Sequence, residues 1–511
     1  MRHLATATLL AAVYCSFALA QPPGEKPKEA PKPNAYPDKA IHAPTPVPDR
    51  VILTWSGDTT TTQSVTWRTD TTVASAVGQI TESAAGPSFD PAWGGKADAV
   101  RTVPAVTEFL ATDLNDCHCH SVTFRALKPQ TKYLYRVGAA PNWSEWFQFE
   151  TASDKAEPFG FIYVGDAQEA IKSHWSRLIR QAHADMPKAK FVLHAGDLIT
   201  RSNSDGQWGE WHAAAGWING SIPCVPSPGN HEYGAPPKTD DELKADGLGA
   251  AVGGAIPKSP SRPSVVTPHW RAQFTLPDHG PAGLEETCYY LDIQGVRLIC
   301  LNSMEKIEAQ VPWLENVLRT NPNKWTIVTF HVPVYSTAAS RQTREETKPV
   351  RAKWRPIFDK YGVDLVLQGH DHCYGRSGLL RDDALLSADD EFERKGSVYV
   401  VSVSGPKQYP VGTMPWMVTN AEKKQFYQLV RVDGDKLHFE ARTADGNLFD
   451  QFELRKKPDG GSELLERGSI EAEKNKSGGS GGREALFALG GMAVLAGGYA
   501  GVRALRGKPA A

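Results

Sequence analysis

Five apolar segments of this chain each lead into an aspartate, an asparagine or a histidine, four of them through a glycine. They are Phe161–Val164 before Asp166, Phe191–Leu193 before Asp197, Ile222–Val225 before Asn230, Ile327–Phe330 before His331, and Val363–Leu367 before His370 and His372. Short apolar runs rich in β-branched and aromatic residues are typical of buried strands. Ligands of α/β sheets bind beyond the carboxyl ends of such strands, so we expect these side chains to meet at one site.

Helix-like stretches alternate with these segments, at residues 175–184, 309–319 and 350–361. Alternation of this kind predicts a layered α/β domain, here residues 156–455, with residues 426–455 closing it as strands. The Gly-, Pro- and Ala-rich stretch 234–267 reads as an inserted loop.

The segment before this domain has a different pattern. Residues 47–152 contain short alternating runs with turn residues between them, for example at 51–55, 64–67 and 132–137. We therefore expect a small antiparallel sandwich of about seven strands in this region.

The N-terminus resembles a secretory signal. Arg2 and His3 precede an apolar run that ends in Ala18-Leu19-Ala20, so we expect residues 1–20 to be removed and the mature chain to begin at Gln21. The alternative is a buried N-terminal helix. Residues 21–46 are Pro-rich and polar and are expected to form an extended linker. Export permits disulfides, but the spacing of the six remaining cysteines does not predict how they would pair.

The C-terminus carries a second targeting feature. Residues 456–484 are expected to be a flexible linker that includes the Gly/Ser run 477–482, and residues 485–508 form an apolar stretch with a basic end. This arrangement predicts a transmembrane anchor or a bacterial C-terminal sorting tail, the alternative being an apolar tail packed on the domain. We therefore expect an exported protein, periplasmic or at the cell surface, with membrane association through the tail.

The balance of charge gives no sign of a nucleic-acid partner. Lys and Arg number 56 and Asp and Glu number 58, for a formal net charge of −2. Such a chain has no basic field, so we expect no binding to nucleic acid.

The residue types after the five strands favour a metal site. Carboxylate, amide oxygen and imidazole together suit Mn, Fe or Zn, and an aspartate can bridge two ions. The run Asp116–His120 also contains metal-type side chains. It precedes a strand of the sandwich and has no partner cluster with zinc-type spacing, so we do not expect a metal there.

The series of motifs resembles the calcineurin-like metallophosphoesterases, and within them the purple acid phosphatase branch, which has an N-terminal fibronectin-III-like domain. The stretches 127–133 and 143–151 of the sandwich region are similar to that domain, and the resemblance covers residues 47–455. It implies a catalytic domain of two sheets flanked by helices.

The resemblance also implies roles for single residues. Asp166 and His372 would hold a first metal ion, Asp197 would bridge, and Asn230, His331 and His370 would hold a second. His231 would lie near the phosphate and protonate the leaving group. Two departures stand out. Thr200 occupies the position of the tyrosine that binds ferric iron in the purple enzymes, and Ser340 and Arg341 occupy those of two substrate-binding histidines. Arg341 is a candidate phosphate contact because a guanidinium matches phosphate geometry, with a solvated surface position as the alternative.

These observations predict an exported phosphatase with two metal ions (Fe, Mn or Zn) that hydrolyses small phosphate monoesters by attack of a metal-bound hydroxide. A phosphodiesterase or nucleotidase on the same scaffold is one alternative, because the motifs concern the metals and not the substrate. A surface binding protein without catalysis is the other.

Overall fold

The computed structural model describes residues 38–96, 99–234, 264–386, 396–458 and 460–466. The predicted signal at 1–20, the tail at 485–508 and most of the inserted loop therefore lie outside the described residues. Within the described residues, no helix has the length and apolar character needed to cross a membrane.

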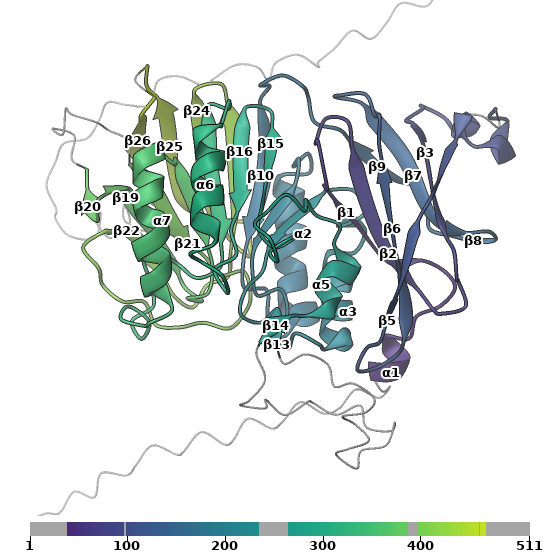
Figure 1. The fold of residues 1–511 in the computed structure, drawn as a ribbon, viewed down its shortest axis with the longest axis horizontal. Coiled ribbons are helices and arrows are strands. Elements are labelled where there is room, and N and C mark those ends of the chain that lie inside the picture. The colour runs from purple at the N-terminus through teal and green to yellow at the C-terminus, as the bar shows by residue number, and fades with distance from the viewer. Residues whose placement is uncertain (1–37, 97–98, 235–263, 387–395, 459, 467–511) are drawn as a thin grey trace, which may run out of the picture.

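The N-terminal domain is a sandwich of two antiparallel sheets with an aromatic core that contains Trp67, Phe124 and Tyr135 (Figure 1). One sheet has the order β1-β2-β6-β5, and the other has the order β4-β3-β7-β8 with β9 paired to β7. The strands are β1 Asp49–Thr54, β2 Gln63–Thr69, β3 Val77–Glu82, β4 Arg101–Pro104, β5 Val106–Leu110, β6 Cys117–Phe124, β7 Lys132–Ala139, β8 Asn142–Trp143 and β9 Phe147–Glu150. The short helical turns are α1 Asp38–Ile41, η1 Pro87–Phe89 and η2 Pro91–Trp93. The sandwich was expected with about seven strands. It has nine in the described residues, because one extended run crosses between the sheets as β4 and β5 and the two-residue β8 pairs with β7.

The second domain contains two sheets that face each other. The first has the order β12-β11-β10-β23-β24-β25-β26, with β10, β11 and β12 parallel. Its strands are β10 Phe159–Val164, β11 Val192–Ala195, β12 Cys224–Ser227, β23 Phe426–Asp433, β24 Lys436–Thr443, β25 Leu448–Lys456 and β26 Ser462–Glu466. The second has the order β15-β16-β17-β18-β21-β19-β20, with β22 paired to β19. Its strands are β15 Tyr289–Ile293, β16 Val296–Cys300, β17 Trp325–Phe330, β18 Leu365–Gln368, β19 Tyr374–Arg381, β20 Ala384–Leu385, β21 Ser397–Val401 and β22 Met417–Ala421.

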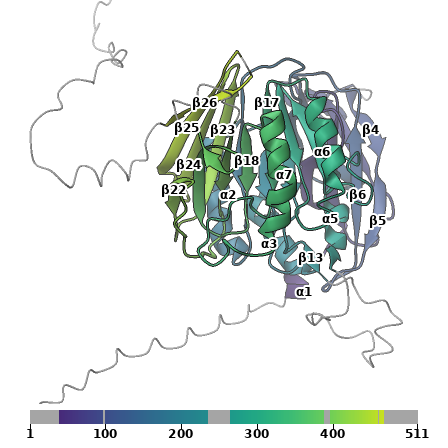
Figure 2. The same ribbon diagram turned by 60° about the vertical axis from the view of Figure 1, so that its left-hand side comes forward.

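Helices cover the outer faces of both sheets, which gives the expected layered architecture (Figures 1 and 2). Against the first sheet lie η4 Ile171–Trp175, α2 Ser176–Asp185 and α3 Asp205–Ala215, and against the second lie α6 Gln310–Arg319 and α7 Thr347–Tyr361. The remaining elements are η5 Gly216–Ile218, α5 Pro268–Gln273 and a small hairpin of β13 Tyr233–Gly234 and β14 Val265–Val266. The core between the sheets includes Phe161, Leu193, Leu298 and Ile327. Each sheet is therefore buried on both faces, by the other sheet on one side and by helices on the other. The near-continuous apolar runs in the sequence predicted this.

Two predicted linker boundaries are wrong. Residues 462–466 were assigned to a flexible linker but form β26, which pairs with β25 and places Glu466 2.7 Å from Arg376. Residues 38–46 were assigned to the Pro-rich linker, but His42 accepts a hydrogen bond from Arg68 through its carbonyl oxygen. In both cases tertiary contacts order a sequence whose local pattern is polar.

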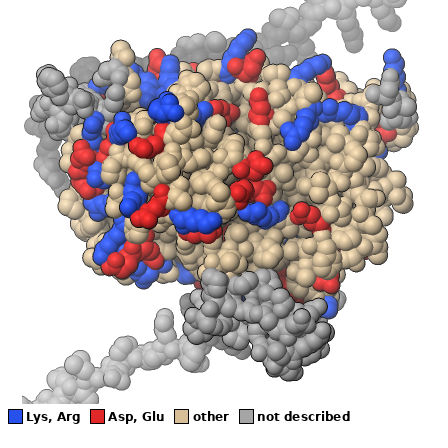
Figure 3. Space-filling view, viewed as in Figure 1, with Lys and Arg blue, Asp and Glu red and all other residues tan. Residues whose placement is uncertain are grey.

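Charged side chains of both signs are interspersed on the face of the molecule drawn in Figure 3. This distribution agrees with the near-neutral net charge of the chain.

Candidate metal centre

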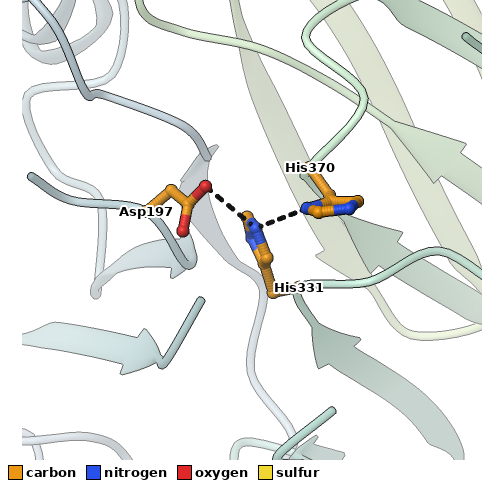
Figure 4. Close-up of side chains that lie close together, drawn as sticks. All are labelled: Asp197, His331 and His370. Atoms are coloured by element: carbon orange, nitrogen blue, oxygen red, sulfur yellow. Dashed lines mark hydrogen bonds and ion pairs between the residues drawn. The ribbon is translucent and has the colours of Figure 1, made fainter. Parts of the chain in front are cut away.

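Two groups of buried Asp and His side chains meet where the two sheets of the second domain face each other. In the described part of the chain, Asp166, Asp197 and His372 form one group and Asp197, His331 and His370 form the other, with all ligand-type atoms of a group within 4.8 Å of one another. Asp197 belongs to both groups. Figure 4 shows the second group, in which His331 Nε2 lies 3.0 Å from Asp197 Oδ2 and 3.1 Å from His370 Nδ1.

The two sheets contribute equally to this cluster. Asp166, Asp197 and Asn230 follow the parallel strands β10, β11 and β12 of the first sheet, whereas His331 follows β17 and His370 and His372 follow β18 of the second. Asn230 joins the second group, because its Oδ1 lies 3.2 Å from His331 Nε2. The predicted convergence of all six side chains is therefore what the structure shows.

The backbone of the predicted ligands is held in an uncommon conformation. The φ angles of Asp166, Asp197, His370 and His372 are 51°, 53°, 75° and 51°, in the left-handed region that non-glycine residues rarely adopt. Such residues cost on the order of 1–3 kcal/mol each and concentrate at functional sites. The backbone conformation that directs these four side chains to one point therefore destabilises the fold locally.

Glycines beside the ligands allow the chains to approach closely. A Cβ at Gly229 would lie 2.3 Å from Asp197 Oδ1, and one at Gly369 would lie 2.4 Å from Asp166 Oδ2. Gly196, directly before Asp197, has a positive φ of 85°, whereas no positive φ occurs at Gly229 or Gly369. Their role is to leave room for the carboxylates.

Hydrogen bonds fix which nitrogen of each histidine faces the cluster. His331 and His372 donate from Nδ1 to the carbonyl oxygens of Ala195 (2.8 Å) and Lys407 (3.0 Å), and His370 donates from Nε2 to Glu346 Oε1 (2.9 Å). The other ring nitrogen of each histidine points into the cluster, where it can bind a metal ion when it carries no proton. Metal-binding histidines have this arrangement, in which an acceptor holds the N–H that does not face the metal.

Asp197 is positioned by a buried carboxylate that sequence reasoning missed. Glu232 accepts hydrogen bonds from the backbone N–H groups of Asp197, Leu198 and Gly229 at 2.7–2.8 Å. It thereby clamps the loop after β11 to the loop after β12. Its place directly after Asn230 and His231 in the same motif was the only signal that could have pointed to it.

The charge of the cluster favours a cation. Burial raises the pKa of Asp166 well above its usual range, and burial together with the nearby Asp197 carboxylate raises the pKa of Glu232 to about 7. Burial alone would also raise the pKa of Asp197, but His331 holds it below its ordinary value. Buried carboxylates of this kind are costly unless a positive charge accompanies them. Together with the oriented imidazole nitrogens, the donor set fits metal ions.

His231 lies at the edge of the cluster. Its Nδ1 donates to the carbonyl oxygen of Thr200, and its Nε2 lies 3.9 Å from Asp197 Oδ2. The His231 side chain is 24% exposed, which makes it the most exposed of the histidines at the cluster.

Arg341 is at the site and not on the solvated surface. Its side chain is 11% exposed, and its Nη1 lies 3.9 Å from Glu346 Oε1, which in turn accepts from His370. Tyr409 lies between Arg341 and the cluster, with its ring centre 4.9 Å from the guanidinium and 4.7 Å from the His372 ring. Glu346 and Tyr409 had no signal in the sequence.

The cysteine- and histidine-containing run 116–120 does not form a metal group in the described structure. His120 bonds to Thr69 and Thr107, and His118 bonds to the carbonyl oxygen of Val73. All six cysteines of the described residues are buried, with free thiols. The hydrogen bonds of His118 and His120 tie this run into the sandwich.

Comparisons with known proteins agree with the geometry. A family model described as calcineurin-like phosphoesterase matches residues 115–374, and one described as purple acid phosphatase, N-terminal domain, matches residues 48–151. Probable purple acid phosphatase 20 of Arabidopsis thaliana is 26% identical over 289 residues, which cover 55% of this chain and 59% of that protein. Acid phosphatase type 7 of Homo sapiens is 24% identical over 368 residues, which cover 65% of this chain and 76% of that protein.

A solved structure shares the fold. Purple acid phosphatase PPD1 from yellow lupin (Lupinus luteus) seeds superposes with a TM-score of 0.62 at 16% identity, over 81% of this chain and 75% of that chain. This likeness confirms the expected order of an all-β domain followed by a layered α/β domain.

Proposed function

Because this chain belongs to the calcineurin-like phosphoesterase family, we propose that it hydrolyses phosphate monoesters with two metal ions bound at the paired Asp and His groups. The observation that carries this proposal is the position of Asp197, whose carboxylate belongs to both groups and is buried between them. A carboxylate so placed suits the bridge of a two-metal site.

In this proposal Asp166 and His372 hold the first ion with Asp197, and Asn230, His331 and His370 hold the second. Two bound ions would activate water as the nucleophile and neutralise charge on the phosphate oxygens. The protein contributes the positions of these ligands, which Glu232, Glu346 and the carbonyl oxygens of Ala195 and Lys407 hold in place.

Arg341 and His231 would act on the substrate itself. The Arg341 guanidinium has a buried Nη1 without an acceptor in the described structure and packs on Tyr409, so it is a candidate to bind a phosphate oxygen. The hydrogen bond from His231 Nδ1 to Thr200 leaves Nε2 to hold the proton that the leaving alcohol receives.

The natures of the two ions are part of the proposal. Thr200 cannot supply a phenolate, and its Oγ1 already accepts the backbone N–H of Glu169 at 3.1 Å. We therefore expect Mn, Zn or ferrous iron at the first position and no purple colour.

The test is hydrolysis of p-nitrophenyl phosphate and its bis-ester by the purified protein loaded with Mn, Fe or Zn. Turnover of the monoester that requires metal supports the proposal. A preference for the bis-ester would replace it with a phosphodiesterase. Two bound metals without turnover of either ester would favour a binding protein.

We also propose that the protein is exported, on the strength of the signal pattern at residues 1–20. Mass spectrometry of protein from the producing cells should give a mature N-terminus at Gln21. An intact N-terminus at Met1 in a cytoplasmic fraction would contradict export.

A further inference from the structure

Gln168 lies against the group formed by Asp166, Asp197 and His372, here called the first group, although its sequence position did not mark it as a metal ligand. It follows Asp166 by two residues, and its side chain is fully buried. Its backbone N–H donates to the carbonyl oxygen of Asp197 at 3.2 Å, so its main chain is tied to the loop that carries the bridging carboxylate. The position of Gln168 is therefore set by the same backbone that sets the ligands.

The amide end of Gln168 contacts two of the proposed ligand atoms. Its Nε2 lies 2.9 Å from Asp197 Oδ2 and 2.8 Å from His372 Nε2. His372 Nε2 faces the first group because His372 Nδ1 donates to the carbonyl oxygen of Lys407. The carboxylate of Asp197 belongs to the same group. The end of the Gln168 side chain thus lies at the point on which the first group converges.

The other end of the same amide has no partner. Gln168 Oε1 is buried and accepts no hydrogen bond in the described structure. An unsatisfied buried acceptor costs about 1–3 kcal/mol, so such an atom calls for an explanation. The two ends of a carboxamide have nearly the same shape, so rotation of the amide by 180° exchanges them within the same space. After this rotation Oε1 faces the point where Asp197 and His372 meet.

We propose that Gln168 Oε1 is a protein ligand of the first metal ion, completing a set with Asp166, Asp197 and His372. This inference rests on the two-metal site of the proposed function. An amide oxygen is a neutral, hard donor that suits Mn and other divalent ions. With Thr200 in place of a tyrosine, the set then carries two carboxylates and no phenolate, and so favours a divalent over a ferric ion at this position.

Metal binding, and not turnover, is the appropriate test. We would titrate Mn²⁺ into metal-free wild type, Gln168→Ala and Gln168→Glu, and follow heat release and bound metal. Gln428→Ala is the matched control, because Gln428 is also buried with an unpartnered Oε1 but lies on β23. We expect Gln168→Ala to bind one of the two ions at least about tenfold more weakly, while Gln168→Glu, which keeps an oxygen donor, binds both.

The outcomes separate this inference from the proposed function. Equal binding of two ions by Gln168→Ala, Gln428→Ala and wild type would overturn the role of Gln168 without touching the proposed activity. If Gln168→Ala binds metal more weakly than wild type and Gln428→Ala does not, Gln168 is supported as a ligand. If the wild type then hydrolyses no phosphate ester, the proposed activity is rejected all the same. If Gln168→Ala does not fold, weaker binding by Gln168→Glu than by wild type contradicts the inference, and binding at least as tight supports it.

Discussion

The guanidinium of Arg341 lies 4.9 Å from the centre of the Tyr409 ring. Its Nη1 is buried and has no hydrogen-bond acceptor among the described residues, and the carboxylate oxygen Glu346 Oε1 lies 3.9 Å away. Aromatic contact fixes the direction of the guanidinium, and the missing acceptor leaves donors for an anion. This arrangement fits the proposed role of Arg341 as a phosphate contact.

We predict that Arg341→Ala raises the KM for p-nitrophenyl phosphate by about 10–100-fold. The estimate follows from the loss of a hydrogen bond between charged groups, about 1.5–3 kcal/mol. Steady-state kinetics with matched metal loading measures it. Arg344→Ala is the control, because Arg344 also pairs with Glu346, at 3.6 Å, but is 47% exposed. An equal change in both variants would mean that Arg341 acts only through Glu346.

The bridging carboxylate gives a second prediction. Replacement of Asp197 with alanine removes an oxygen from both groups, so we expect loss of bound metal and a fall in kcat/KM of about 1,000-fold, or about 4 kcal/mol of transition-state stabilisation. Elemental analysis and kinetics of purified protein measure the two effects. Asp435→Asn, which changes an exposed carboxylate paired with Lys324, should alter neither. Normal metal content and turnover in Asp197→Ala would contradict the assignment of the site.

The meeting of the proposed ligands was predictable from the sequence because each lies within four residues of the end of a buried strand. His331 and Asp197 need no knowledge of the fold beyond the rule that strand ends converge. The residues that position the ligands were not predictable in the same way. Glu346 belongs to the turn that starts α7, 24 residues before His370, and reaches it only because α7 packs on the second sheet.

The strand β26 illustrates the same limit for the fold. Its five residues follow Gly460 and Gly461 and include two glutamates, which locally resemble a linker. What orders them is pairing with β25 and the ion pair between Glu466 and Arg376, which also binds Asp450 at 2.6 Å. Long-range contacts of this kind leave no periodic signal.

Glu346 itself gives a third prediction. Its hydrogen bond from His370 is the main cause that lowers the pKa of Glu346 to about 2, so it is a carboxylate at neutral pH. Glu346→Ala removes the acceptor that orients the His370 ring, and we expect the affinity for one Mn²⁺ ion to fall by about 10–100-fold. Calorimetric titration measures it. Glu345→Gln is the control, because Glu345 is the neighbouring residue and pairs with Lys348 on the surface. Unchanged affinity for both ions would show that the ring is held by other contacts.

The interface between the two domains gives the last prediction. Asp205, at the start of α3, accepts from Arg50 of β1 at 2.6 and 3.1 Å and from Arg68 of β2 at 3.3 Å. Burial would raise the pKa of Asp205, but Arg50 and Arg68 outweigh burial and hold it below its ordinary value. A carboxylate whose pKa is lower in the folded state stabilises the fold above its unfolded pKa, about 3.9, and loses this contribution as the pH falls through its folded pKa.

We therefore expect Asp205→Asn to lower the free energy of unfolding by about 3–5 kcal/mol at pH 7, because the buried Arg50 guanidinium loses its charged partner while Arg68 keeps its pair with Asp49. The difference from wild type should shrink as the pH falls from about 3.9, where the unfolded carboxyl begins to take up its proton, to below the folded pKa, where the folded wild-type carboxyl is protonated as well. Urea unfolding at a series of pH values measures both effects. Glu285→Gln, an exposed carboxylate paired with Arg271 at 3.6 Å, should differ little from wild type at any pH. A difference between Asp205→Asn and wild type that stays constant down to the lowest pH would show that packing, and not the charge of Asp205, joins the sandwich to the catalytic domain.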